Sequence, residues 1–358
     1  MKCGLPFVVA LMLAGCSSDE SGTGSSQQSN DTTTTDTVGA TVGGVTTQKE
    51  ADTGRTGGAV RSAGCGRPSA PAVTDERRTL DSDGTERWYL LTTPESGVDQ
   101  PLPLLLDFHG LSEGAEVHAR MTSFDALAKE RKFVVVYPNG TGALASWQVD
   151  AANNPDLAFV DRLLDTLEGE LCIDTSRVYA SGLSNGAMFS STLACQRSDR
   201  IAAIAPVAGI QYQAGCQTDR PVPIIAFHGT KDPILLFNGG LGELGGLFSG
   251  AFSASDVVLP EPDLDGEGYP AAVREWATHN GCEPRPSDTR PVTGVMLRTY
   301  DCPFDGPVEF YVVEGGGHAW PGSEFSRSIE KIIGMTNMEL HASELIWDFL
   351  SSHRLPTD

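Results

Sequence analysis

A serine between two glycines is the first place where this sequence could carry chemistry. Gly182-Leu183-Ser184-Asn185-Gly186 fits the pattern G-x-S-x-G, in which a sharp strand-to-helix turn exposes a nucleophilic hydroxyl. The pattern is weak by itself, because a chain this rich in glycine contains it by chance in about one case in three. Its surroundings support it, since residues 177–183 are typical of a buried strand and residues 185–193 of a helix.

His318 is the histidine best placed to act as the base for Ser184. Three glycines precede it and allow unusual backbone conformations, and its loop directly follows the apolar stretch 307–313. Hydrolases with this serine pattern carry the acid and then the histidine after the serine. His228 comes before the expected acid, and the remaining candidates lie in or near expected helices: His279, His341 and His353.

The expected acid is Asp232, which lies just after the apolar stretch 221–229. A carboxylate at this point can accept a hydrogen bond from the ring of His318, fix its tautomer and stabilise the imidazolium. Asp263 and Asp265 are rivals, but they belong to an acidic loop that is typical of a solvated surface.

Two backbone amides are expected to stabilise the oxyanion that forms when a serine attacks an ester. One is the amide of Asn185, immediately after the serine. The other is expected from the loop after the stretch LLLDFHG, from Leu111 or Gly110. His109 is expected to order this loop rather than to take part in the chemistry.

Two tryptophans and one glycine-rich stretch have less certain roles. Trp147 and Trp320 could flank the acyl group of a substrate, or they could belong to ordinary packing. Residues 240–245 fit G-x-G-x-x-G, but the loop-like sequence after them does not offer the helix that a dinucleotide site requires. Residues 236–254 could instead form an apolar flap beside the acid. We find no metal-ligand spacing and expect neither a metal nor a cofactor.

The elements that position these residues are predicted by apolar runs without alternation, which are typical of strands buried on both faces of a parallel sheet. Helical patterns lie between the runs. The expected fold class is therefore α/β, with a doubly wound, mostly parallel sheet and helices on both faces. The six runs are 101–110, 133–140, 177–183, 201–209, 221–229 and 307–313, and the helices are 123–132 with Ser123 as N-cap, 156–171 and 342–353.

The N-terminal residues resemble a bacterial lipoprotein signal. Residues 1–15 combine Lys2 with a short apolar core, and Leu13-Ala14-Gly15 precedes Cys16, the expected lipidation site. An ordinary secretory signal is the alternative. Residues 16–62 are rich in Ser, Thr and Gly and are expected to form a disordered tether. Residues 63–358 then form one catalytic domain.

The net charge limits which partners this protein can be expected to bind, and the cysteine content indicates the compartment in which it works. The formal net charge of −22 makes nucleic acid and anionic lipid poor partners, so only the lipid anchor would bind a membrane. We expect a monomer that takes an ester substrate. Beyond Cys3 and Cys16, an even number of cysteines remains, and their spacing alone does not decide how they pair: Cys65, Cys172, Cys195, Cys216, Cys282 and Cys302. Three disulfides would fit an extracytoplasmic protein, secreted or anchored at the cell envelope.

Seven motifs, taken in order, resemble the secreted esterases of the polyhydroxybutyrate depolymerase and feruloyl/acetylxylan esterase group. The resemblance spans about residues 65–350 and implies an α/β-hydrolase fold with Ser184, Asp232 and His318 as the triad. It also implies the disulfide pairs Cys65–Cys172, Cys195–Cys216 and Cys282–Cys302. The motifs are LLLDFHG, VVYPNGTGALASW, VYASGLSNGAM, IAAIAPVAG, HGTKDPI, HNGC and GGGHAWPG.

The expected function is that of an exported serine carboxylic-ester hydrolase. The resemblance implies release of feruloyl or acetyl groups from plant xylan. A polyhydroxyalkanoate depolymerase or a general short-chain esterase would use the same triad with a different pocket. A lipid-anchored binding protein on an inactive hydrolase fold is the alternative without catalysis, and its mark would be a missing triad residue. The stretch between Asp232 and REWATHNGC is longer than expected for the group, which leaves the shape of the pocket open.

Overall fold

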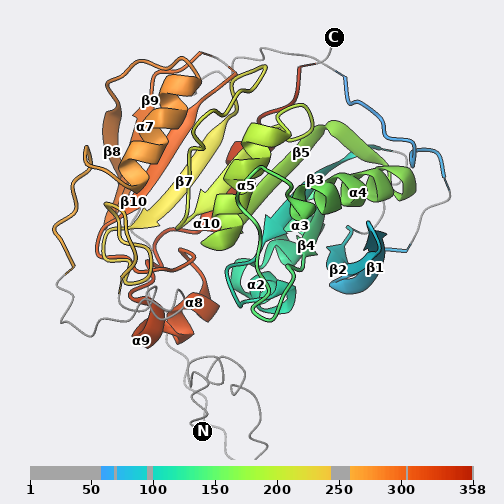
Figure 1. Cartoon of the computed structure of the whole chain (residues 1–358), viewed down its shortest axis with the longest axis horizontal. Coiled ribbons are helices and arrows are strands. Elements are labelled where there is room, and N and C mark those ends of the chain that lie inside the picture. The colour runs from blue at the N-terminus through green and yellow to red at the C-terminus, as the bar shows by residue number, and fades with distance from the viewer. Residues whose placement is uncertain (1–57, 68–70, 95–99, 243–258, 304, 357–358) are drawn as a thin grey trace, which may run out of the picture. The chain divides into compact units, whose positions relative to one another are not determined.

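A ten-stranded sheet runs through the computed structural model, which describes residues 58–67, 71–94, 100–242, 259–303 and 305–356 (Figure 1). The strand order is β1-β2-β4-β3-β5-β6-β7-β10-β9-β8. The central strands β4, β3, β5, β6, β7 and β10 are parallel, whereas the two strands at each edge run antiparallel. The strands are β1 (Glu76–Ser82), β2 (Thr85–Thr92), β3 (Leu102–Phe108), β4 (Val134–Pro138), β5 (Ile173–Leu183), β6 (Ala203–Val207), β7 (Ile224–Gly229), β8 (Ser287–Val292), β9 (Val295–Tyr300) and β10 (Val308–Val313).

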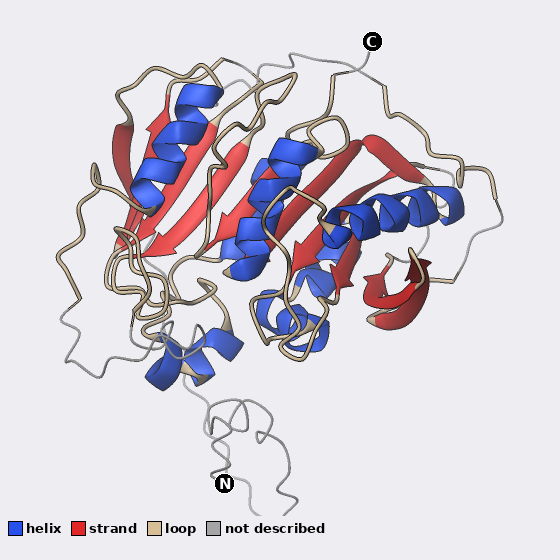
Figure 2. Cartoon of the chain, in the orientation of Figure 1, coloured by secondary structure: helices blue, strands red, loops and turns tan. Residues whose placement is uncertain are grey.

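Helices cover both faces of this sheet (Figure 2). One apolar core joins the sheet to α4, α5 and α7, and a second core on the opposite face joins it to α2, α3 and α10. The short helices α8 and α9 lie near the edge at which β7 and β10 end (Figure 1). The helices are α2 (Ala115–Thr122), α3 (Phe124–Arg131), α4 (Pro155–Glu170), α5 (Asn185–Gln196), α7 (Tyr269–His279), α8 (Glu324–Ser328), α9 (Glu330–Ile333) and α10 (Ala342–Ser351).

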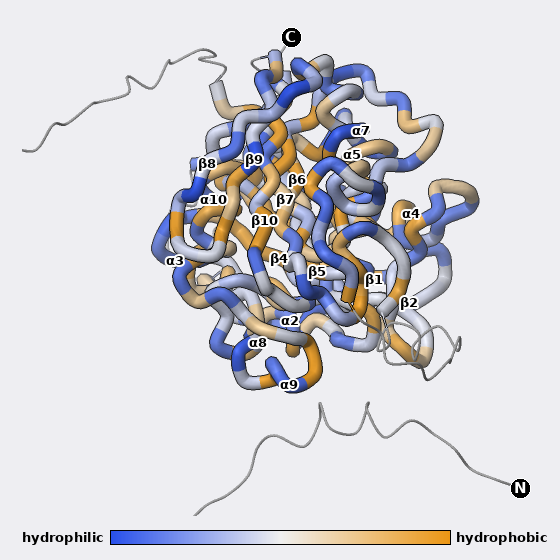
Figure 3. Tube along the Cα trace, turned by 90° about the vertical axis from the view of Figure 1, so that its left-hand side faces the viewer, coloured by the Kyte–Doolittle hydropathy of each residue, from blue (hydrophilic) through white to orange (hydrophobic). Residues whose placement is uncertain are grey.

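The central strands consist mainly of apolar residues, which are orange in Figure 3, and their side chains are buried on both faces of the sheet. In β3, Leu104 and Leu106 pack into one core while Leu105 packs into the other, and all three are fully buried. Five of the six apolar runs contain a whole strand of the parallel sheet, and the sixth, 177–183, lies within β5. The prediction of a doubly wound, mostly parallel sheet with helices on both faces is confirmed, and the fold is that of an α/β-hydrolase.

The antiparallel edges were not predicted. β1 and β2 form a hairpin whose turn residues Asp83 and Gly84 both have positive φ angles, 52° and 78°, as the Asp-Gly signal favours. Ser123 is the N-cap of α3, as predicted, and it is also the C-cap of α2. It has φ 52°, and its side chain makes no capping hydrogen bond.

The predicted N-terminal boundary differs from the structure. Residues 60–62 were assigned to the tether, yet Arg61 forms an antiparallel bridge with Asp174, and the Ser62 amide donates to Ile173 O at 2.9 Å. The signal over 1–15, the lipidation site Cys16 and most of the tether lie outside the described residues, as does most of the expected flap over 236–254. Within the described ranges, no helix has the length and apolarity needed to cross a membrane.

Three disulfides join parts of the described chain, and they are the pairs that the resemblance implied. Cys65–Cys172 links residues 107 apart and ties the N-terminal segment to the residues before β5. Cys195–Cys216 and Cys282–Cys302 close short loops of 21 and 20 residues in sequence separation. Disulfides of this kind are typical of proteins that leave the reducing cytosol.

Candidate active site

Ser184 lies at a sharp turn between the end of β5 and the start of α5. Its backbone angles, φ 56° and ψ −118°, are strained for a residue with a side chain, and such strain concentrates at functional sites. Glycines make the turn possible: a Cβ atom at Gly182 would lie 2.6 Å from the carbonyl oxygen of Phe108, and one at Gly186 would overlap the same oxygen. The elbow therefore packs directly against the end of β3, and Ser184 stays partly exposed.

The carboxylate of Asp232 is held tightly by its surroundings. Its Oδ1 accepts the amides of Ile234 and Leu235, both at 2.8 Å, and its Oδ2 accepts Nδ1 of His318 at 2.7 Å. Burial alone would raise the pKa of this carboxyl, but the nearby His318 and His228 and the Leu235 amide lower it. Asp232 is therefore ionised, and its bond to Nδ1 leaves Nε2 of His318 as the ring nitrogen that can accept a proton.

The sheet brings the three predicted triad residues to one edge. Ser184, Asp232 and His318 follow the carboxyl ends of β5, β7 and β10, which lie in the order β5-β6-β7-β10 in the parallel part of the sheet. The acid and histidine loops touch, since the Lys231 amide donates to the carbonyl oxygen of Gly316 at 2.9 Å. Among the described residues, hydrogen bonds connect His318 to Asp232 but none connects the hydroxyl of Ser184 to His318.

The loop after β3, which we call the oxyanion loop, contains the two predicted alternatives for the second donor, Gly110 and Leu111. Their amides differ in their hydrogen bonds. The amide of Gly110 donates to Oε2 of Glu113 at 2.6 Å, so of the two predicted alternatives the structure favours Leu111 as the donor. Leu111 remains, because within the described chain its amide has no hydrogen-bond acceptor, and the same holds for the amide of Asn185 at the start of α5. A Cβ atom at Gly110 would lie 3.5 Å from Cβ of Ser184, so the loop borders the elbow.

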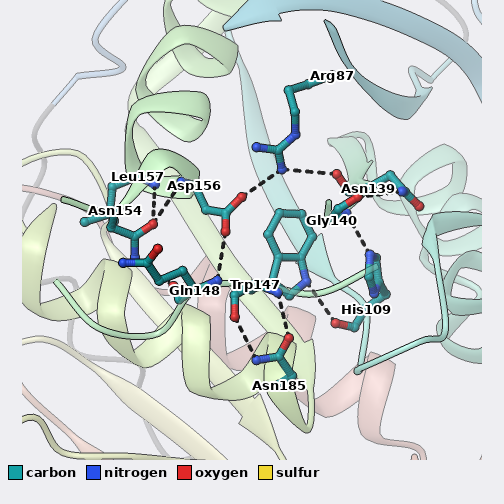
Figure 4. A network of polar contacts seen from close by, with 10 residues as sticks. All are labelled: Arg87, His109, Asn139, Gly140, Trp147, Gln148, Asn154, Asp156, Leu157 and Asn185. Carbon is teal, nitrogen blue, oxygen red and sulfur yellow. Dashed lines mark hydrogen bonds and ion pairs between the residues drawn. The ribbon is translucent and has the colours of Figure 1, made fainter. Parts of the chain in front are cut away.

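His109 is fully buried and holds this loop, as predicted. Its Nε2 accepts the amide of Gly140 at 2.8 Å, so the proton is on Nδ1, which donates to Gly110 O at 2.7 Å. Burial lowers the pKa of His109 to about 4, and the ring is therefore neutral at neutral pH. Its contacts with Gly140 and with the indole of Trp147 appear in Figure 4.

Trp147 and Trp320 belong to the core, so the prediction that they flank the acyl group is not supported. Trp147 is 3% exposed, stacks on Phe189 and donates its indole N–H to His109 O at 3.0 Å. Trp320 is 1% exposed and donates its indole N–H to Ser343 Oγ at 2.9 Å. In both indoles the polar atom already has a partner.

The side chain of Asn185 clamps a neighbouring loop to the elbow. Its Oδ1 accepts the amide of Trp147 at 2.8 Å, and its Nδ2 donates to Trp147 O at 3.1 Å (Figure 4). The loop continues into a buried ion pair between Arg87 and Asp156, 2.8 Å apart, and the other oxygen of Asp156 accepts the Gln148 amide. Asn185 thus uses its side chain for structure, and its backbone amide has no acceptor among the described residues.

The residues rejected as base or acid occupy other places. His228 is buried beside Asp232, and its Nε2 lies 3.0 Å from Leu235 O. His279 contacts the hydroxyls of Tyr212 and Thr218 instead of the triad. The rival Asp265 pairs with Arg298 at 2.8 Å and is 80% exposed. Within the described ranges, no group of three His, Cys, Asp or Glu side chains could hold a metal ion.

Sequence reasoning missed a buried cluster behind the oxyanion loop. His118 of α2 is fully buried, with Nδ1 3.1 Å from Glu113 Oε1 and Nε2 3.2 Å from Asp107 Oδ1. Asp107 also accepts the hydroxyl of Ser181 from the adjacent strand. Only the spacing of Glu113, three residues after Gly110, could have been noticed in the sequence.

A serine elbow and a histidine–aspartate pair at one edge of this sheet are the features of a serine hydrolase with the α/β-hydrolase fold. Residues 88–240 match the family model described as esterase PHB depolymerase. A protein of Aspergillus terreus named as a feruloyl esterase C is 30% identical over 196 residues, covering 52% of this chain and 67% of that protein. The chain belongs to this esterase family and is a carboxylic ester hydrolase.

Other similar proteins match less of their length or show less identity. The bifunctional acetylxylan esterase/xylanase XynS20E of Neocallimastix patriciarum is 38% identical over 133 residues, which cover 37% of this chain and 20% of that protein. This chain thus spans about a fifth of that relative. The solved acetyl xylan esterase of Aspergillus awamori has 15% identity and a TM-score of 0.48, with 72% of this chain and 98% of that chain covered.

Proposed function

We propose that this protein is an exported serine esterase that removes feruloyl or acetyl groups from xylan, with Ser184, His318 and Asp232 as its catalytic triad. The observation that carries the proposal is the 2.7 Å hydrogen bond between His318 and the buried Asp232, at the sheet edge where the elbow presents Ser184. The similar proteins named as feruloyl esterase C and as a bifunctional acetylxylan esterase/xylanase support the substrate class.

The mechanism is acyl transfer in two steps. Nε2 of His318 takes the proton of the Ser184 hydroxyl as its oxygen attacks the ester carbonyl, and Asp232 stabilises the imidazolium. The amides of Asn185 and Leu111 donate to the oxyanion. His318 then protonates the leaving alcohol, and the acyl group stays on Ser184. A water, deprotonated by His318, then attacks the acyl-enzyme, and His318 returns this proton to the Ser184 oxygen as the acid leaves.

Export and anchoring rest on the N-terminal sequence and on the disulfides. A signal over residues 1–15 with lipidated Cys16 would hold the domain at the cell envelope, and the tether would separate it from the membrane. The three disulfides fit the oxidising side of the membrane. Labelling with a radioactive fatty acid tests the anchor, since Cys16→Ser would remove the label.

Hydrolysis of a polyhydroxyalkanoate is the second candidate, and the family model that matches residues 88–240 favours it. The two candidates share the triad and differ in the groups that bind the substrate. Family membership speaks against the alternative of a binding protein without catalysis, and the sequence contains all three of the proposed triad residues.

The test compares three readouts on two substrates and includes one catalytic variant. We would measure ferulate and acetate released from feruloylated, acetylated arabinoxylan, together with the clearing of a polyhydroxybutyrate suspension. Ser184→Ala should abolish activity, whereas Ser352→Ala, a change in an exposed serine after α10, should not alter it. Release of ferulate or acetate supports the xylan esterase, and clearing of the polyester alone supports the second candidate. Full activity of Ser184→Ala would refute both.

A further inference from the structure

We propose that Glu113, held by His118, is a positioning residue of the oxyanion hole. It fixes the loop between β3 and α2 so that the amide of Leu111 is free for the substrate's oxyanion. The inference rests on the proposed function, because it assigns a purpose to the cluster behind the proposed oxyanion donors. No substrate group contacts Glu113 in this account, and its effect passes through the backbone of Gly110.

Gly110 is fixed from both sides of its backbone. Its amide donates to Oε2 of Glu113 at 2.6 Å, and its carbonyl oxygen accepts Nδ1 of His109 at 2.7 Å and the Glu113 amide at 3.2 Å. A trans peptide bond directs its C=O and N–H to opposite sides. Since the carbonyl of Gly110 faces His109, the amide of Leu111 faces away from His109.

Glu113 would not stay in this position without its own support. Its side chain is 8% exposed, and its second oxygen lies 3.1 Å from Nδ1 of His118, whose side chain is fully buried. Nε2 of His118 lies 3.2 Å from Asp107 Oδ1, close enough for an ion pair although not aligned as a hydrogen bond. His118 therefore joins a carboxylate at the end of β3 to the carboxylate that holds the loop.

The charge balance of the cluster favours a permanently charged His118. Burial alone would lower the pKa of His118, but the charges of Asp107 and Glu113 outweigh it and raise the pKa to about 10. Burial likewise would raise the pKa of Glu113, and the charge of His118 lowers it instead. His109 lies on the opposite side of Gly110. The charged groups that affect its pKa are Glu113, His118 and Arg87.

Two substitutions of Glu113 distinguish the effect of its side-chain length from the effect of its charge. Glu113→Asp keeps the charge that His118 needs but shortens the side chain by one methylene, so its carboxylate should no longer reach the amide of Gly110. Glu113→Gln keeps the reach and an acceptor oxygen but loses the charge. For a short-chain aryl ester we expect kcat of Glu113→Asp to fall about tenfold to a hundredfold with KM nearly unchanged, as for loss of an interaction made in the transition state.

The Gln variant should show the opposite pattern. We expect its kcat to stay within about threefold of the wild-type value, while its urea midpoint falls because His118 loses one of its partners. A boronic acid that mimics the tetrahedral intermediate should bind Glu113→Asp more weakly, by the same factor as kcat/KM falls. Glu116→Asp, a matched change in an exposed residue of α2, should alter none of these values.

The results that overturn the inference are distinct from those that overturn the proposed function. Wild-type kcat in Glu113→Asp would refute the positioning role, and so would equal losses of kcat in the Asp and Gln variants. If Glu113→Asp does not fold, Glu113→Gln still tests the positioning role. A large loss of kcat in Glu113→Gln, with an affinity for the boronic acid equal to that of the wild-type protein, would refute this role. In each case Ser184→Ala is assayed beside the variants. An inactive Ser184→Ala with an unaffected Glu113→Asp leaves the proposed function standing.

Discussion

Two buried histidine–carboxylate pairs lie near the same sheet edge, and we propose opposite purposes for them. His318 contacts one carboxylate, that of Asp232, which also accepts hydrogen bonds from two backbone amides. His118 lies between two carboxylates and has no exposed surface. A catalytic base must gain and lose a proton in each turnover, whereas a structural cation must keep it. The two rings differ in the number of carboxylates that they contact, one for His318 and two for His118.

The largest effect in this comparison is expected at the first pair. His318→Ala and Asp232→Asn should each lower kcat about 10⁴-fold, because the serine loses its base or the base loses its tautomer. The urea midpoint should change little in the Asn variant. Steady-state hydrolysis of a short-chain aryl ester measures the effect, and His341→Ala, at an exposed histidine, is the matched control. A drop in His341→Ala of the same size would contradict the assignment of His318.

The second pair should control stability instead. His118→Phe leaves Asp107 and Glu113 buried without a counter-charge, and breaking such a group costs about 3–5 kcal/mol of the free energy of unfolding. Adding Glu113→Gln to this variant removes one uncompensated charge and should restore part of the loss. Urea unfolding of the two variants measures it. If His118→Phe were as stable as the wild-type protein, His118 would not be a charged link between the carboxylates.

The sequence could predict the first pair and not the second for a physical reason. Ser184, Asp232 and His318 each follow an apolar run that is recognisable as a buried strand, and parallel strands end at a common edge. His118 and Asp107 become neighbours only because α2 packs across the end of β3, which no local pattern reveals. The hairpins of β1–β2 and β8–β9 were missed similarly, since their half-exposed strands carry no continuous apolar run.

The oxyanion loop shows how a motif can locate a segment and still leave two candidate atoms open. The stretch LLLDFHG located the loop, and either Leu111 or Gly110 could have been the donor. The choice depended on Glu113, whose carboxylate takes up the amide of Gly110. Trp147 and Trp320 were also located correctly beside the motifs, but both indoles pack inward. Sequence identifies the segment that carries a function more readily than it identifies the group that performs it.

The pH dependence of stability should separate the neutral buried histidines from the charged one. Burial lowers the pKa of His109, His228 and His353 to about 4. The unfolded chain binds protons below its own pKa of about 6.5 while the folded chain does not, so stability falls as the pH drops from 6.5 toward 4. For each of the two fully buried rings, His109 and His228, this amounts to about 2 kcal/mol between pH 7 and pH 5.

His118 acts in the opposite direction. Its folded pKa of about 10 lies above the unfolded value, so its contribution is complete below about pH 6.5 and is lost as the pH rises toward 10. The free energy of unfolding should therefore be largest near pH 6.5, which urea titrations between pH 4.5 and 10 can measure. His353→Gln, at the end of the chain away from the site, should make the acid limb less steep. An unchanged acid limb in this variant would show that His353 titrates normally in the folded protein.

The smallest expected effect concerns the support of the oxyanion loop from the other side. Trp147→Phe keeps an aromatic ring between Phe108 and Phe189 but loses the indole hydrogen bond to His109 O. One lost hydrogen bond to a buried carbonyl should cost about 1 kcal/mol of the free energy of unfolding and lower kcat less than about threefold. KM for a feruloyl ester should not change, because the ring is buried away from substrate. A rise in KM with unchanged stability would instead place Trp147 in the acyl pocket.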